Sequence, residues 1–174
     1  MLVANPSLVG TARTMPPQIR SVMSMNNLNR YRIDPLLGIG PVRFGMNRHE
    51  VQNVMPETSK PFMKTKFSKV ETDSFHEAGF QVFYNEKACV EYIELSRCCP
   101  FIAELFSIDP FRFKVEELIK KISEKAKYDE SNPEIGYSFI FPEIELSLWR
   151  SDIEDKYFLT IGIGQKGYYS SKSS

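Results

Sequence analysis

The chain has 174 residues, enough for one domain of ordinary size, and 42% of them are hydrophobic, which favours a folded core over disorder. Basic and acidic residues balance at 22 each, but residues 1–70 carry ten basic and three acidic side chains, and residues 71–174 carry twelve and nineteen. No apolar run approaches the roughly 20 residues that span a bilayer, so we do not expect a membrane protein.

The two ends of the chain read differently from its middle. Residues 1–30 hold four Met, three Arg and no acidic residue, and the first acidic residue of the chain is Asp34. We interpret residues 1–30 as a disordered lead, or as sequence before a translation start at Met23 or Met25. An Arg-rich transit peptide is the alternative. Residues 169–174 predict a flexible tail.

The cysteine and histidine content argues against a fold held by disulfide bonds or by a metal ion. Of the three cysteines two are adjacent, which is a poor disulfide framework, and the two histidines do not complete a ligand spacing. We therefore expect a cytoplasmic protein with no metal and no cofactor.

Two helices are predicted from capping signals and apolar spacing. Residues 47–55 begin with Asn47 as N-cap and Glu50 in the capping-box position, and Pro56 ends them. Residues 114–124 place apolar side chains on one face, with charged residues outside.

The other elements read as strands. Residues 33–46 are rich in Gly and Pro and predict loop with a short strand. The remaining strands are predicted at residues 80–84, 90–95, within 100–113, and at 137–141, 144–149 and 157–163, with a hairpin turn at 85–88. Strict alternation puts Glu91 and Glu94 on opposite faces, so one of them should lie near an edge or a bulge.

The order of elements repeats, with a helix followed by a strand meander in each half of the chain. We predict an α+β fold with two such repeats, at about 42–97 and 101–165, in a single domain spanning 31–168. Both helices are expected to pack on one face of an antiparallel sheet.

The segment Phe44-Gly-Met-Asn-Arg-His-Glu-Val51 resembles the helix start of small helix-plus-meander folds. Those folds include the outer-membrane assembly lipoproteins and the β-lactamase inhibitory proteins. The stretch 38–95 is also similar to small bacterial proteins of the immunity-protein type. The resemblance covers about a third of the chain, implies a protein-binding role, and brings no catalytic residues.

Three function classes stay open. The first is a non-catalytic immunity protein that captures a protein partner, such as a cationic toxin domain, through an acidic surface with aromatic anchors. Its candidate contacts are Glu143, Glu145, Trp149, Asp152, Glu154, Asp155 and Tyr157. Core packing is the alternative role for Trp149.

The second class binds nucleic acid or another anionic surface through a basic run with interleaved aromatics. Its candidates are Arg43, Arg48, Lys60, Lys64, Lys66 and Lys69. We favour a protein partner over nucleic acid, because the rest of the folded core is acidic. The third class is a small enzyme, although no nucleophile motif accompanies His49 or His76. A homodimer formed through a sheet edge is a further alternative.

Overall fold

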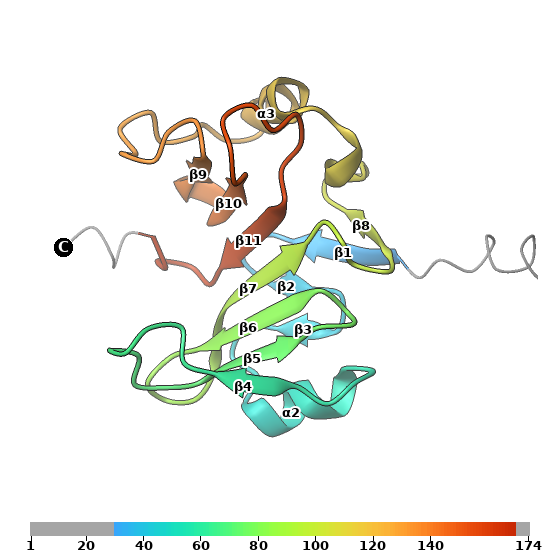
Figure 1. Cartoon of the computed structure of the whole chain (residues 1–174), viewed down its shortest axis with the longest axis vertical. Helices are drawn as coiled ribbons and strands as arrows, with labels where there is room; N and C mark the ends of the chain where they lie inside the picture. The colour runs from blue at the N-terminus through green and yellow to red at the C-terminus, as the bar shows by residue number, and fades with distance from the viewer. Residues whose placement is uncertain (1–29, 170–174) are drawn as a thin grey trace, which may run out of the picture.

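The computed structural model describes residues 30–169 (Figure 1). The N-terminal lead predicted for residues 1–30 lies outside this range except for Arg30, which begins the first strand. The tail predicted for residues 169–174 lies outside it except for Tyr169.

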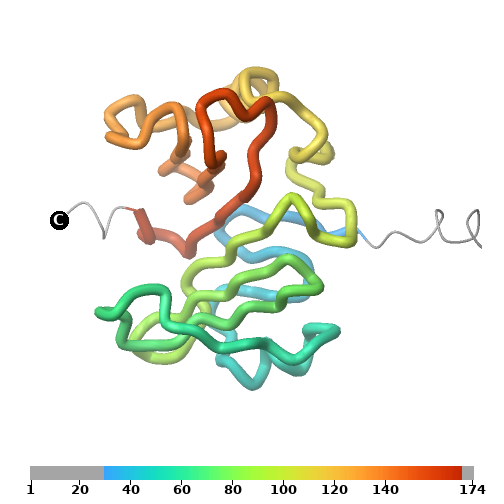
Figure 2. Tube along the Cα trace, in the orientation of Figure 1, coloured from blue at the N-terminus to red at the C-terminus, as the bar shows by residue number. Residues whose placement is uncertain are grey.

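A seven-stranded antiparallel sheet forms the body of the protein. Its strands, in spatial order, are β4 (Lys60–Phe62), β5 (Thr72–Phe75), β6 (Phe80–Tyr84), β7 (Val90–Ser96), β11 (Thr160–Gly164), β10 (Leu146–Trp149) and β9 (Ser138–Phe141). The two meanders meet where β7 pairs with β11, so the last strand of the chain lies inside the sheet (Figure 2).

A second, four-stranded sheet lies against the first. Its order is β3 (Val42–Arg43), β2 (Gly38–Ile39), β1 (Arg30–Asp34) and β8 (Ile102–Glu104). The β1–β8 pairing is parallel and the other two are antiparallel. In the view of Figure 1, β2 and β3 lie partly behind β6 and β7, whereas β8 is drawn to their upper right.

The α-helices of the described range are α2 (Arg48–Val54) and α3 (Val115–Ser123). As predicted, Asn47 caps α2 and forms a reciprocal capping box with Glu50. Short 3-10 turns lie at η1 (Pro110–Arg112) and η2 (Pro142–Ile144). No helix in the described part of the chain is both long and apolar enough to cross a membrane.

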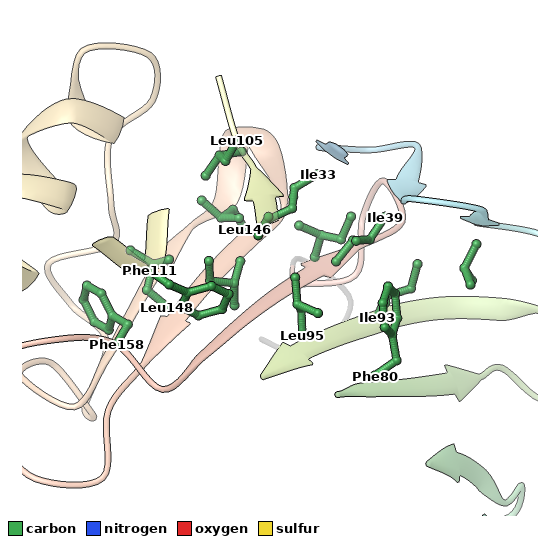
Figure 3. Close-up of a cluster of buried hydrophobic side chains, with 14 of the residues drawn as sticks. Ile33, Ile39, Phe80, Ile93, Leu95, Leu105, Phe111, Leu146, Leu148 and Phe158 are labelled. Atoms are coloured by element: carbon green, nitrogen blue, oxygen red, sulfur yellow. The ribbon is translucent and has the colours of Figure 1, made fainter. Parts of the chain in front are cut away.

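One continuous core joins both sheets and both helices. Ile33 and Ile39 of the small sheet meet side chains from one face of the large sheet, including Ile93, Leu95 and Leu146 (Figure 3). Buried residues of α2 and α3 belong to the same cluster. One cluster of buried side chains therefore joins the small sheet and both helices to the large sheet, and the α+β class is confirmed.

Parts of the sequence-based prediction are wrong in detail. The small sheet was not foreseen beyond one short strand at 33–46 and one within 100–113, and β5 was not predicted at all. The strand expected at 144–149 begins at Leu146, because residues 142–144 form η2 and Glu145 adopts a left-handed backbone with φ of 49°. The irregularity expected near Glu91 or Glu94 is confirmed as a bulge at Glu91, the extra residue of β7 that faces the step from Phe83 to Tyr84.

Both outer strands of the large sheet are poorly suited to pairing with another chain. β4 has three residues and contains Pro61, which has no N–H to donate. On β9, the carbonyls of Ser138 and Ile140 accept hydrogen bonds from Asn132 Nδ2 (3.0 Å) and Asp129 N–H (2.8 Å).

Candidate functional site

The second face of the large sheet carries no helix within residues 30–169, and we call it the open face. The strand register places side chains from seven strands on it in one row: Lys60, Ser74, Gln81, Glu94, Gly162, Ser147 and Ile140. Polar and small residues dominate this row because alternation turns the large apolar neighbours toward the core.

A groove of about 410 Å³ lies on the open face over β7, β11, β10 and β9. Its lining includes the side chains of Lys64, Tyr92, Glu94, Glu134, Ser147 and Trp149. A second groove, of about 480 Å³, lies toward the β4–β5 loop and includes Phe67 and Glu86. Lys64 and Tyr168 line both, so the two grooves adjoin along the open face.

Gly162 shapes the floor of the first groove. Tyr92 lies across this glycine and is hydrogen-bonded to Ser147 Oγ at 2.8 Å. A Cβ at position 162 would overlap the Tyr92 phenol, so only glycine admits this arrangement. Burial raises the pKa of Tyr92 well above its ordinary value, which keeps the phenol neutral.

The residues after β11 fold back onto the open face. Tyr168 stacks on Tyr92 with ring centroids 4.6 Å apart and an interplanar angle of 14°, and Tyr169 approaches edge-on. The Glu145 carboxylate accepts hydrogen bonds from the Gly167 N–H (2.6 Å) and the Tyr169 N–H (3.0 Å). Glu145 is therefore buried and anchors the C-terminal turn, and its carboxylate does not face a partner as the sequence suggested.

Glu94 is the half-buried carboxylate of the groove. Burial raises the pKa of its carboxyl, and the positive charge of Lys64 opposes that rise. Lys64 acts at a distance, because no ion pair within 4 Å joins it or any other described side chain to Glu94. The amino group of Lys64 instead lies 4.4 Å from the centre of the Phe83 ring.

The predicted acidic contacts are divided between the two ends of β10. Glu143 is exposed at the start, beside the buried Glu145, whereas Trp149 and the acidic turn 152–155 lie at the end. Trp149 is 41% exposed and lines the groove, so it is not a core residue. Asp152 and Glu154 are exposed in the turn that follows it.

Two of the predicted contacts have internal roles. Asp155 accepts hydrogen bonds from Ser151 Oγ (2.8 Å) and the Asp152 N–H (3.0 Å), which lower the pKa of its carboxyl. Its carbonyl also accepts from Arg150. The guanidinium carbon of Arg97 lies 4.2 Å from the centre of the Tyr157 ring.

The predicted basic residues do not gather into one surface. Arg43 pairs with Asp34 (3.1 Å), Lys69 with Glu86 (2.6 Å), and Arg48 with Glu71 (3.1 Å) and the buried Asp73 (3.2 Å). Lys60 and Lys66 are exposed, and Lys66 lies over the Phe67 ring. Half of the six cations are thus neutralised by carboxylates of the same chain.

Sequence reasoning missed the groove itself. Glu94 was noted only for its place in the strand alternation, and Glu134, Tyr92 and Ser147 were not selected. The alternation of β7 was the available signal, since it separates Tyr92 and Glu94 from the core-facing Ile93 and Leu95. Within the described residues, no group of three or more His, Cys, Asp or Glu side chains could hold a metal ion.

No family model, curated protein or solved structure matches this chain. The resemblance to helix-plus-meander and immunity-type proteins therefore stays a prediction from the sequence.

Proposed function

We propose that this chain is a non-catalytic protein-binding module that captures its partner on the open face of the large sheet. One observation carries the proposal: a sheet face that helices and a second sheet leave uncovered holds a groove with a half-exposed Trp149 at its end. Exposed tryptophans beside polar groups are typical anchors of protein interfaces.

The charges around Trp149 favour a cationic partner. Glu94 and Glu134 line the groove, and Asp152 and Glu154 are exposed in the turn beside Trp149. Complementary charge of this kind speeds association and selects the partner. An immunity protein that blocks a cationic toxin domain is the specific form we propose. We also propose that the two halves, α2 with β4–β7 and α3 with β9–β11, are tandem repeats of one unit.

Binding to an anionic surface is a second candidate, supported by the β4–β5 loop. Phe67 is 81% exposed in this loop and Met63 47%, with Lys64 and Lys66 beside them. Exposed apolar residues among lysines suit an anionic lipid or nucleic-acid surface.

Paired charge changes separate the two candidates. The assay is co-purification of the tagged chain with the protein encoded by the neighbouring gene. The double variant Asp152→Lys/Glu154→Lys should abolish capture, whereas Glu116→Lys/Glu124→Lys, which makes the same change in charge on and beside α3, should leave it intact. Asp155 stays unchanged because it holds the turn.

The loop variant Lys66→Gln/Phe67→Ser tests the second candidate, because neither residue lines the groove that contains Trp149. It should leave protein capture unchanged, and it should abolish binding to anionic vesicles or oligonucleotides if that candidate is correct. If capture survives the acidic-turn variant and is lost in the loop variant, the partner binds through the basic loop, and the proposed binding site beside Trp149 is wrong.

A further inference from the structure

Trp149 has unusually small neighbours on the open face. Its register partners are Ser138 on β9 and Thr160 on β11, both hydroxyl residues. Bulky neighbours at these positions would pack against the indole, but serine and threonine leave much of the ring accessible from the groove. The result is a 41% exposed aromatic surface on β10, with a hydroxyl residue at the paired position of each neighbouring strand.

The Glu94 carboxylate opens into the same groove. Within the described residues no hydrogen-bond donor contacts its oxygens, yet no described side-chain oxygen is both buried and unpartnered. The oxygens of Glu94 therefore reach the solvent of the groove. Burial penalises the charge of this half-buried carboxylate, and Lys64 offsets that cost only from beyond ion-pair distance, so a cation in direct contact would stabilise it further.

We infer that this groove is a subsite for one arginine side chain of the partner, with the guanidinium between the Trp149 ring and the carboxylates of Glu94 and Glu134. This inference rests on the proposed function and gives it a chemical specificity. The two carboxylates and Lys64 leave the groove with net negative charge, and Lys64 is engaged with Phe83 at 4.4 Å. A cation rather than an anion is the complementary ligand.

A guanidinium suits the site better than an ammonium. It is planar, so it stacks on an indole while its edge donates hydrogen bonds to carboxylates in a fixed fork. An ammonium forms compact ion pairs and keeps a stronger hydration shell, which the open groove does not replace. The site should therefore prefer arginine to lysine.

Trp149 is the single tryptophan of the chain, so its fluorescence reports directly on the subsite. The probe is a short peptide with blocked ends, Gly-Gly-Arg-Gly-Gly, titrated at low salt. Its controls carry citrulline, which has the same shape without the charge, or lysine in place of arginine. The arginine peptide should change the Trp149 emission saturably, the lysine peptide should bind more weakly, and the citrulline peptide should have no effect.

Two variants locate the effect. Glu94→Gln should weaken the arginine titration by about tenfold or more, because it removes the charge and keeps the shape. Glu143→Gln, an exposed change outside the groove, should leave the titration unchanged. Near-ultraviolet circular dichroism checks that both variants fold as the parent does. An equal response to citrulline, an equal response to lysine, or a titration that Glu94→Gln does not weaken would overturn the arginine subsite.

Co-purification of the partner distinguishes this inference from the proposed function. If the peptides show no arginine preference but Asp152→Lys/Glu154→Lys still abolishes capture, the subsite is wrong and the open-face proposal stands. The opposite result is also informative. If the arginine peptide binds as expected, but the Asp152→Lys/Glu154→Lys variant and Glu94→Gln both leave capture intact, the subsite is correct and the open-face proposal fails.

Discussion

Replacing Gly162 with alanine should destabilise the protein by about 3 kcal/mol, although the change adds one methyl group. That methyl would overlap the Tyr92 phenol and approach Ser147 Oγ to 2.7 Å. Tyr92 must therefore move, which removes its hydrogen bond to Ser147 and disturbs its stacking on Tyr168. A lost buried hydrogen bond costs about 1 kcal/mol or more, an aromatic pair about 1 kcal/mol, and overpacking about 1–3 kcal/mol. The better strand propensity of alanine returns less than about 1 kcal/mol.

Urea denaturation followed by Trp149 fluorescence measures this change, and Gly45→Ala is the matched control. Nothing lies within 4 Å of a Cβ at position 45, so its φ of 83° is the only source of strain there, worth about 1 kcal/mol. Because the clash at position 162 is with Tyr92, the cost of Gly162→Ala should fall by at least about 1 kcal/mol in a Tyr92→Ala background. A cost below about 1 kcal/mol, or strict additivity with Tyr92→Ala, would refute this account of the groove floor.

Three further predictions follow from buried groups. Glu145→Ala removes two charge-assisted hydrogen bonds, those from the N–H groups of Gly167 and Tyr169. It should lower the free energy of unfolding by about 2–4 kcal/mol and speed hydrogen exchange at residues 165–169. Unchanged exchange there would contradict the anchoring role of Glu145. Glu94→Gln should stabilise the fold at pH 8. Burial raises the folded-state pKa of this acid above its unfolded value, so ionised Glu94 costs stability above the folded pKa, and the cost disappears below the unfolded one. Unfolding midpoints should therefore converge toward pH 4, and a destabilised variant at pH 8 would show the opposite sign. Burial raises the pKa of the Cys99 thiol to about 11, so at pH 8 iodoacetamide should label it about a hundredfold more slowly than an ordinary thiol. Mass spectrometry should find the exposed Cys98 modified first. Equal labelling rates would show that Cys99 is accessible.

Local signals in the sequence were sufficient for the local elements. Asn47 and Glu50 fix the start of α2, and their hydrogen bonds, at 3.0 and 2.7 Å, are those expected of a capping box. The alternation in 80–84 and 90–95 predicted β6 and β7, including an irregularity that the structure places at Glu91. These features depend on residues close together in the chain, which is why pattern reasoning reaches them.

The missed features depend on distant residues. β2 and β3 have two residues each, too few to show a period, and β1 pairs with β8 across some seventy residues of chain. The role of Glu145 follows from its left-handed backbone and from the position of Gly167 and Tyr169, which no short window contains. Likewise, Glu94 and Trp149 become parts of one groove only when β11 and β10 lie beside β7.

The central place of β11 also governs how this protein can be synthesised. On the ribosome, β4–β7 emerge before β11, and the β7 edge that pairs with β11 stays unpaired until residues 160–164 have been synthesised. Until then the first meander exposes a long strand edge, a state prone to aggregation and to chaperone binding. A chain that stops before Thr160 would lose more than a terminal strand, because β4–β7 and β9–β10 would no longer share a sheet.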